Sequence, residues 1–201
     1  MAKLYFKYGA MGSSKSAQAL ITKYNYEENN LSVWLIKPSA DTRDGVNILR
    51  SRIGLEARAE IITSETDIFI RFAETQAGSC HVVIVDECQF MTEAQIDQLR
   101  AIVNEYAVPV LCFGLRTDFQ TKLFPGSRRL MELADVIEEI KTMCDCGVKA
   151  TINARIDGDG FIVTQGEQVV LGGNDSYIAM CHRCYVNGIR EHKKIKLHGS
   201  H

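Results

Sequence analysis

The chain has 201 residues, of which 46% are apolar and 24% are charged, and its formal net charge is −2. These values are typical of one ordinary globular domain, or of one domain with a small appendage. The small net charge argues against a nucleic-acid-binding surface, and no apolar run approaches the roughly 20 residues of a membrane span. The chain opens directly on strand-like residues, so we expect no signal peptide and a cytoplasmic location.

The first informative feature is a loop of small residues between a strand-like run at residues 4–8 and a helix-like run at residues 17–24. This is the layout of a phosphate-binding P-loop, in which backbone N–H groups and a helix N-terminus surround anionic oxygens. Lys15 would reach the β- and γ-phosphates of a nucleotide, and the Ser16 hydroxyl would ligate Mg²⁺. The predicted phosphate-binding residues are Gly9, Ala10, Met11, Gly12, Ser13, Ser14, Lys15 and Ser16.

Ser14 departs from the usual P-loop pattern, which has glycine at this position. Serine carries a β-carbon, so a positive φ there costs more than it does for glycine. The alternative interpretation of this stretch is a serine-rich turn that only caps the following helix.

The remainder of the first 143 residues alternates between apolar runs and segments with helical spacing. Strands are predicted at residues 31–36, 60–63, 82–85, 109–114 and 136–143. Helices are predicted at residues 67–75, 92–106 and 127–134, with Thr92 as the N-cap of the second. This alternation predicts an α/β fold, a P-loop parallel sheet flanked by helices, with ligands bound at the carboxyl ends of its strands.

The apolar strand at residues 82–85 ends in two adjacent acids, Asp86 and Glu87. An apolar strand followed by an acid is the Walker B layout, in which the carboxylate holds Mg²⁺ directly or through water. Adjacent carboxylates project in different directions, so one can serve the metal while the other faces the substrate. The alternative is a solvated acidic loop start without a catalytic role.

Two aromatic residues, Phe119 and Phe124, lie in the loop that follows the strand at residues 109–114. Rings at the ligand-binding edge of the sheet could stack on a planar base. They could equally plug the loop into the core, and the sequence leaves both interpretations open.

Four of the seven cysteines form two close pairs about 35 residues apart. Cys144 and Cys146 form a C-x-C pair, which is tighter than the usual zinc spacing, and Cys181 and Cys184 form a C-x-x-C pair. Two thiolate pairs suit a four-coordinate structural Zn²⁺, which has no open position for chemistry. The alternative is a set of free thiols in the core.

The alternating pattern of strands and helices gives way at Cys144 to the cysteine pairs. We therefore predict two domains, an α/β nucleotide-binding domain at residues 1–143 and a small zinc-binding domain at residues 144–201. Within the second, residues 157–160 predict a hairpin turn, and a flexible Gly-Gly-Asn turn at residues 172–174 precedes Tyr177. A loop tethered at its far end by a zinc site could fold over a ligand without unravelling.

Taken together, these motifs resemble the thymidine kinase family found in vertebrate cytosol and many bacteria, and the bacterial branch most closely. The resemblance covers nearly the whole chain. It rests on the P-loop, on DECQF at residues 86–90, on GLRTDF at residues 114–119, on the two cysteine pairs and on VVLGGNDSY at residues 169–177.

The resemblance implies transfer of the ATP γ-phosphoryl group to the 5′-hydroxyl of thymidine or deoxyuridine, a step of nucleotide salvage. Glu87 matches the general base, and Ser16 and Asp86 match the Mg²⁺ contacts. The implied ATP-binding set also includes Asp86, Glu87, Cys88, Gln89, Arg43 and Arg52. The implied nucleoside contacts are Leu115, Phe119 and Phe124 for the thymine pocket, Val169, Val170, Leu171 and Gly172 for a lasso loop, and Tyr177 for the sugar.

The resemblance further implies ATP with Mg²⁺, a structural Zn²⁺, feedback inhibition by dTTP and a homotetramer, with neither nucleic acid nor membrane as a partner. Two rival functions stay open at this point. DECQ also resembles the DExx form of a helicase-like ATPase, although the chain is short for paired motor domains. A non-enzymatic zinc-ribbon binding module is the second rival, and it leaves the P-loop unexplained.

Overall fold

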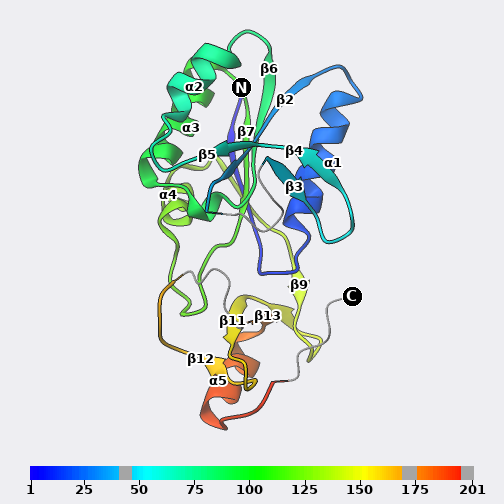
Figure 1. The fold of residues 1–201 in the computed structure, drawn as a ribbon, viewed down its shortest axis with the longest axis vertical. Coiled ribbons are helices and arrows are strands. Elements are labelled where there is room, and N and C mark those ends of the chain that lie inside the picture. The colour runs from blue at the N-terminus through cyan, green and yellow to red at the C-terminus, as the bar shows by residue number, and fades with distance from the viewer. Residues whose placement is uncertain (41–46, 169–175, 196–201) are drawn as a thin grey trace. The chain divides into compact units, whose positions relative to one another are not determined.

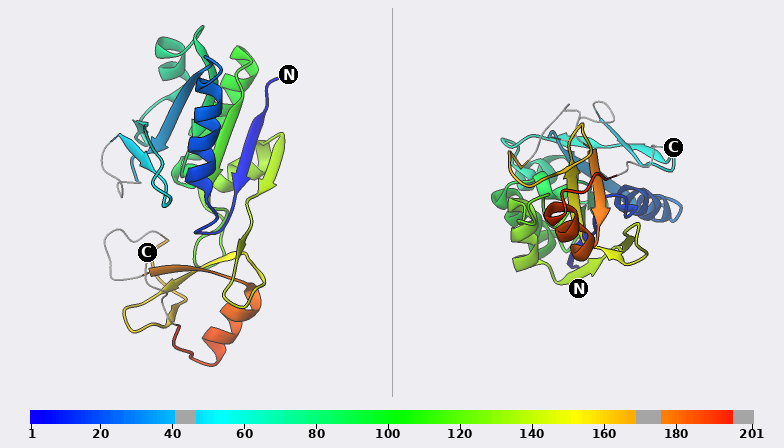
Figure 2. Two further views of the ribbon diagram at one scale, coloured as in Figure 1. Left: turned by 90° about the vertical axis from the view of Figure 1, so that its right-hand side faces the viewer. Right: turned by 90° about the horizontal axis from the view of Figure 1, so that it is seen from below.

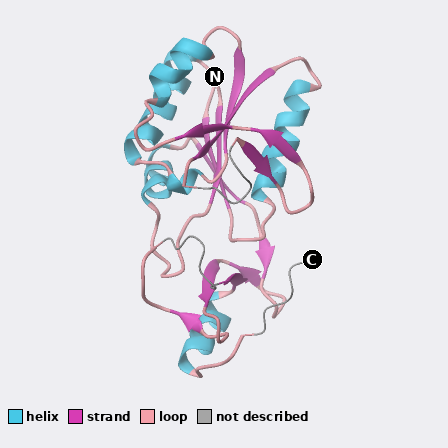
Figure 3. Cartoon of the chain, viewed as in Figure 1, coloured by secondary structure: helices cyan, strands magenta, loops and turns pink. Residues whose placement is uncertain are grey.

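The computed structural model describes residues 1–40, 47–168 and 176–195. It divides into two compact units (Figures 1 and 3). Each unit has its own hydrophobic core. The first unit comprises Met1–Tyr8, Ser14–Leu115 and Phe124–Ile140, and the second comprises Gly9–Ser13, Arg116–Leu123 and Lys141–His201. The domain limits expected from the sequence, 1–143 and 144–201, stay a prediction.

The first unit is built on a six-stranded sheet in which every neighbouring pair of strands is parallel. The strand order is β5–β2–β6–β7–β1–β8. The strands are β1 (Leu4–Tyr8), β2 (Ser32–Pro38), β5 (Glu60–Ile62), β6 (Cys80–Val85), β7 (Val110–Gly114) and β8 (Val136–Glu139). The expected parallel α/β sheet is therefore confirmed.

Helices cover both faces of this sheet (Figures 1 and 2). One face carries α1 (Lys15–Glu27), and the other carries α2 (Ile68–Thr75), α3 (Glu93–Tyr106) and α4 (Pro125–Leu133). The side chains of β6 alternate between the two cores. Val83 and Val85 pack in the core that includes residues of α2, α3 and α4, whereas Val82 and Ile84 pack in the core that includes residues of α1. Burial on both faces explains why this strand is apolar without interruption.

A capping box fixes the start of α3. The Thr92 hydroxyl accepts a hydrogen bond from Gln95 N at 3.2 Å, and Thr92 N donates to the Gln95 side chain at 3.2 Å. Both bonds satisfy N–H groups that a helix leaves without partners in its first turn. The predicted N-cap is confirmed, and it sets the end of the connection that follows β6.

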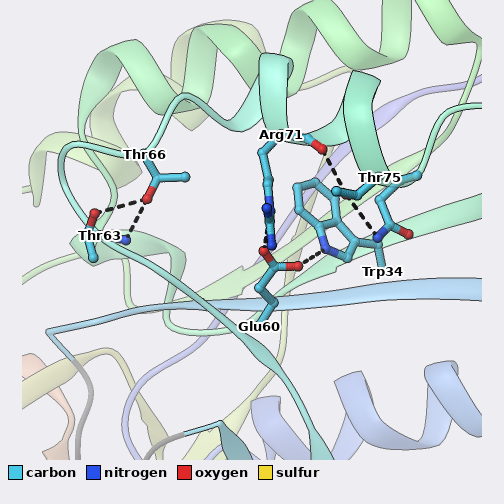
Figure 4. Close-up of polar contacts among 7 residues, drawn as sticks. Trp34, Glu60, Thr63, Thr66, Arg71 and Thr75 are labelled. Atoms are coloured by element: carbon cyan, nitrogen blue, oxygen red, sulfur yellow. Dashed lines mark hydrogen bonds and ion pairs between the residues drawn. The ribbon is translucent and has the colours of Figure 1, made fainter.

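A buried indole ties the edge strand β5 to the rest of the first unit (Figure 4). Glu60 on β5 accepts hydrogen bonds from Trp34 Nε1 at 2.8 Å and from Arg71 Nε at 2.7 Å. Trp34 is only 4% exposed, so its N–H needs a partner inside the protein. One carboxylate therefore joins β5 to both β2 and α2.

The single strand expected at residues 136–143 is wrong, because the structure has two strands there. β8 pairs with β1 as far as Glu139, and the chain resumes as β9 (Thr142–Met143), which pairs antiparallel with β10 (Lys149–Ala150). The division between the two units falls after Ile140. The apolar pattern runs through this point, so it could not reveal a change of sheet.

Residues 51–54 lie in the turn of a short hairpin. Its strands are β3 (Ile48–Arg50) and β4 (Glu56–Arg58), which pair antiparallel. Neither of these two strands was predicted, because three residues give only a weak pattern.

The second unit contains an antiparallel sheet of order β12–β11–β13 and one helix (Figure 3). Its elements are β11 (Ile152–Ile156), β12 (Ile162–Val163), β13 (Ser176–Met180) and α5 (His182–Arg190). Asp157 Oδ1 accepts hydrogen bonds from the backbone of Asp159 and Phe161 at 3.0 and 2.8 Å, which confirms the predicted turn. Across the described ranges, no helix is long and apolar enough to cross a membrane.

Candidate active site

The start of α1 and the end of β6 meet through two polar side chains. Ser16 lies in the first turn of α1, and its Oγ donates a hydrogen bond to Asp86 Oδ2 at 2.7 Å. Asp86 directly follows β6 and is 1% exposed. The carboxyl ends of parallel strands share one edge of a sheet, which is why a loop after β1 and an acid after β6 come together.

Burial and neighbouring groups shift the pKa of the Asp86 carboxyl. Burial raises the pKa of Asp86 to about 7, and repulsion from the Glu87 carboxylate acts in the same direction. The hydrogen bond from Ser16 and the Lys15 charge oppose this rise in pKa. Lys15, Ser16, Asp86 and Glu87 therefore form one electrostatic cluster within the first unit.

The same cluster fits a magnesium ion. Among the described residues, Asp86 Oδ1 is buried and has no hydrogen-bond partner. A buried carboxylate oxygen without a donor is costly unless a cation or water occupies the space beside it. Carboxylate and hydroxyl oxygens are the ligands that Mg²⁺ prefers, so Ser16 and Asp86 are suited to hold it.

Glu87 has an uncommon backbone conformation, with φ of 51° and ψ of 36°. Few residues other than glycine adopt the left-handed region, and those that do often lie at functional sites because the surrounding structure holds them there. Glu87 is the N-cap of the short 3₁₀ helix η1 (Cys88–Phe90).

Gln89 holds the Glu87 side chain. Its Nε2 donates to Glu87 Oε2 at 2.5 Å, and its Oε1 accepts from Leu115 N at 3.0 Å. Gln89 is 1% exposed, and both ends of its amide are engaged. Since Leu115 N fixes the amide oxygen, the amide NH₂ is left pointing at the carboxylate of Glu87.

Two glycines leave the space that η1 occupies. A β-carbon on Gly114 would lie 2.6 Å from both Cys88 Sγ and Gln89 Oε1. A β-carbon on Gly126 would lie 2.6 Å from Cys88 O and 2.8 Å from Met91 O. The sequence analysis did not single out either glycine. Their positions, one at the end of a strand and one at the start of a helix, were the only signal of a close approach by another segment.

The P-loop contains two positive φ values, 74° at Gly12 and 60° at Ser14. Ser14 is the N-cap residue of α1, yet its side chain makes no capping hydrogen bond. The cap-only interpretation of this turn therefore has no support at Ser14. Lys15 is 8% exposed at the start of α1.

The aromatic residues of the loop after β7 pack inside their own units. The Arg155 guanidinium lies 5.2 Å from the ring centroid of Phe119, and Tyr185 Oη donates to Phe119 O at 3.0 Å. Phe124 packs edge-on against Phe90 with ring centroids 5.7 Å apart. These contacts match the core-plugging interpretation, and a role in base stacking stays a prediction.

The four paired cysteines gather in the second unit, where their Sγ atoms all lie within 4.8 Å of one another. Cys146 Sγ and Cys181 Sγ are 3.6 Å apart. Four sulfurs around a tetrahedral Zn²⁺, each bonded at about 2.3 Å, would lie about 3.8 Å apart. The arrangement therefore fits the predicted zinc ion.

The thiols of this cluster share hydrogen bonds. A hydrogen bond from the Val148 backbone and others from Cys184 and Cys181 lower the pKa of Cys146 to about 6. The corresponding bonds to Cys146 and Cys181 raise the pKa of Cys184 to about 12. Gly147, with φ of 80°, allows the tight turn in which its N–H bonds to Cys144 O at 2.8 Å.

Comparison with known proteins identifies the protein family of this chain. The family model described as thymidine kinase matches residues 2–185. The chain belongs to the thymidine kinase family. A thymidine kinase of Yersinia pestis is 45% identical over 191 residues, which cover 94% of this chain and 97% of that protein.

Other members of the thymidine kinase family are similar to the same extent. The thymidine kinase of Jannaschia sp. is 45% identical, over 91% of this chain and 94% of its own length. That of Pasteurella multocida is 43% identical, over 92% and 97%. A solved Pif1 helicase from Candida albicans aligns with a TM-score of 0.39 and 13% identity over 69% of this chain and 36% of its own, too low to bear on fold or function.

The remaining residues that the thymidine kinase resemblance singles out are placed as follows. Leu115 directly follows β7 and is half-buried, and Tyr177 is half-buried on β13 opposite Arg155. Arg52 is exposed in the turn of the β3–β4 hairpin. Arg43 and the lasso residues Val169, Val170, Leu171 and Gly172 lie outside the described residues.

Proposed function

We propose that this protein transfers the γ-phosphoryl group of ATP to the 5′-hydroxyl of thymidine, and of deoxyuridine, to give the 5′-monophosphate. Family membership supports the choice of reaction. The observation that carries the proposal is the Ser16–Asp86 hydrogen bond at 2.7 Å with Lys15 and Glu87 acting on the same carboxyl. It joins the two parts that phosphoryl transfer requires, a phosphate-binding loop and an acid pair.

Glu87 is proposed as the general base that accepts the proton of the 5′-hydroxyl. A carboxylate within hydrogen-bond reach of a primary alcohol is a reasonable base. The Gln89 amide at 2.5 Å restricts the rotamers of Glu87, so the carboxylate is held before substrate arrives.

The P-loop is proposed to hold ATP, with Gly9 to Ser16 around the phosphates and Lys15 on the β- and γ-phosphates. When bound, Mg²⁺ at Ser16 and Asp86 would neutralise charge on the transferred phosphoryl group. Cys88 and Gln89 were expected to belong to the ATP-binding set. Their full burial in η1 favours an indirect role for their side chains rather than direct contact with phosphate.

The nucleoside is proposed to contact Leu115, Phe119 and Phe124, with Tyr177 on the sugar and the lasso loop on the base. Readout of thymine by backbone groups would reject cytosine, which has a donor where thymine has an acceptor. Arg43 and Arg52 remain proposed phosphate contacts. Feedback by dTTP and a homotetramer stay predictions from the resemblance. A structural zinc ion, for which the cysteine cluster is suited, and a cytoplasmic location are likewise proposed.

A phosphorylation assay with thymidine and labelled ATP tests the proposal. We expect the parent protein to form labelled thymidine monophosphate, and Glu87→Gln to lower kcat by about 10²–10⁴-fold with thymidine binding retained. Glu93→Gln, in the first turn of α3, removes a negative charge from a residue outside the cluster and serves as the control. Equal rates for the parent and Glu87→Gln would remove Glu87 from this role. ATP hydrolysis stimulated by nucleic acid, without nucleoside phosphorylation, would instead favour the helicase-like ATPase.

A further inference from the structure

One buried amide in the second unit connects two loops that lie far apart in the sequence. Asn153 lies on β11 and is 3% exposed. Its Oδ1 accepts a hydrogen bond from Met11 N at 2.8 Å, and its Nδ2 donates to Thr117 O at 2.9 Å. Met11 lies within the P-loop, and Thr117 lies two residues before Phe119, in the loop proposed to receive the nucleoside.

The chemistry of these two bonds requires an asparagine or a close equivalent. One partner is a backbone donor and the other is a backbone acceptor, so the bridging side chain must present an acceptor and a donor together. Rotating the amide by half a turn would face NH₂ with the Met11 N–H and oxygen with the Thr117 carbonyl, and both contacts would repel. Aspartate could serve only Met11, and leucine could serve neither loop.

Each of the two loops is held by further hydrogen bonds. In the first, Ser13 N donates to Ala10 O at 3.2 Å, and Thr142 Oγ1 donates to Gly12 O at 3.5 Å. In the second, Asp118 Oδ1 accepts from Gln120 N at 2.8 Å and from Lys122 N at 2.9 Å. A displacement of either loop therefore moves a braced segment and strains the amide between them.

We propose that Asn153 is a positioning residue that couples nucleotide binding at the P-loop to nucleoside binding at the loop of residues 116–123. The identity of the two ligands rests on the proposed function. When phosphates order Met11, the amide orders Thr117, and the second ligand then has less ordering to supply. The effect is reciprocal, since linkage requires each ligand to change the affinity of the other by the same factor.

Calorimetry measures this coupling directly. Thymidine is titrated into the full chain with and without saturating ADP and Mg²⁺, and the ratio of the two Kd values is the coupling factor. We expect thymidine to bind about 5-fold or more tightly to the ADP-loaded parent. In Asn153→Leu the ratio should fall toward one.

Asn153→Asp separates the two arms of the bridge. Its carboxylate can still accept from Met11 N but repels the Thr117 carbonyl, so the coupling ratio should fall toward one, and its negative charge should also weaken the binding of the ADP phosphates. Ile152→Val is the matched control, because Ile152 is buried on the same strand and belongs to the core of the second unit. It should lower thermal stability while leaving the ratio unchanged.

Hydrogen–deuterium exchange on the parent gives an outcome that needs no variant and no thymidine. Adding ADP and Mg²⁺ alone should slow exchange of the backbone amides of residues 116–123. A parent ratio near one, an unchanged ratio in both Asn153 variants, or unchanged exchange in residues 116–123 would each overturn the coupling. Failure to bind or phosphorylate thymidine would overturn the proposed function instead, and the exchange result would still decide the coupling.

Discussion

Ser14 adopts a left-handed backbone conformation, φ 60° and ψ 24°, at the position where P-loops usually have glycine. The β-carbon makes this conformation about 1 kcal/mol less favourable than it would be for glycine. The Ser14 Oγ does not cap the helix and accepts a hydrogen bond from Gln18 Nε2 at 3.5 Å.

We therefore expect Ser14→Gly to raise the melting temperature by a few degrees and to leave the KM for ATP unchanged or lower. Ser14→Ala is the matched control, since it removes the hydroxyl and keeps the β-carbon, and it should not stabilise the protein. A large rise in the KM for ATP in Ser14→Gly would show that the serine has a dedicated role. Thermal unfolding and steady-state kinetics provide both measurements.

Gln89 is expected to act on catalysis through Glu87. Gln89→Met keeps a similar side-chain length but loses the donor to Glu87 and the acceptor for Leu115 N. Because a small misplacement of a reacting group can cost about 100-fold, we expect kcat to fall by about 10–100-fold with the KM for thymidine nearly unchanged. Gln76→Met, at the end of α2, is the control. A variant whose KM rises while kcat is retained would contradict this assignment.

Asp86 makes stability depend on pH. Its pKa in the folded protein is about 7, above the ordinary aspartate value of 3.8, so the folded state binds this proton more tightly than the unfolded state. The stability that the folded state gains by holding Asp86 protonated is therefore fully present below about pH 4. It declines as the pH rises and is lost above about pH 7. Without Mg²⁺ or nucleotide, Asp86→Asn should be more stable than the parent at pH 8 by about 1–3 kcal/mol, and this advantage should shrink toward pH 5. Urea unfolding at the two pH values measures the difference, and an equal advantage at both would contradict the shifted pKa.

At the scale of elements, the short helix η1 depends on glycines in two other elements. Gly126 near the start of α4 and Gly114 at the end of β7 both leave room for its backbone or side chains. The position of Glu87 is thus set by the packing of β7 and α4 as much as by its own strand.

Gly126→Ala should push η1 away from α4, because the new β-carbon would meet the Cys88 and Met91 carbonyl oxygens at 2.6 and 2.8 Å. Overpacking of this kind typically costs about 1–3 kcal/mol, and we expect kcat to fall as well. Gly158→Ala is a suitable control, because a β-carbon there would meet nothing within 4 Å and its φ lies outside the left-handed region. Unfolding and kinetic measurements on both variants test this, and an unperturbed Gly126→Ala would show that η1 is not confined by α4.

At the scale of the whole molecule, we expect a metal at the cysteine cluster to stabilise the second unit, whose core includes Cys144 and Cys181 themselves. That unit is small, and small units commonly need a metal to supplement their core. It also contains Gly9–Ser13, so its stability bears on the P-loop.

Cys146→Ser should therefore abolish binding of one zinc ion per chain and lower the melting temperature by several degrees. Cys80→Ser changes a half-buried thiol outside the cluster and should retain the metal. Metal analysis and thermal unfolding of both variants make the comparison. Retention of zinc by Cys146→Ser would exclude this residue as a ligand.

The sequence by itself determined the elements whose signal is local. The apolar run at residues 82–85 predicted a strand, Thr92 predicted the start of a helix, and the P-loop spacing predicted a phosphate-binding loop. Each of these features depends on a few adjacent residues, through burial on both faces, capping or a tight turn. The two cysteine pairs likewise predicted a cluster from their spacing.

Only the tertiary structure decided which distant residues meet. It brought Ser16 to Asp86, turned the Gln89 amide toward Glu87 and placed Asn153 between Met11 and Thr117. It also divided residues 136–143 between two sheets. These contacts depend on the order of the strands, on the space that glycines leave and on hydrogen bonds, most of which join residues more than 30 positions apart. A local sequence pattern contains none of this information.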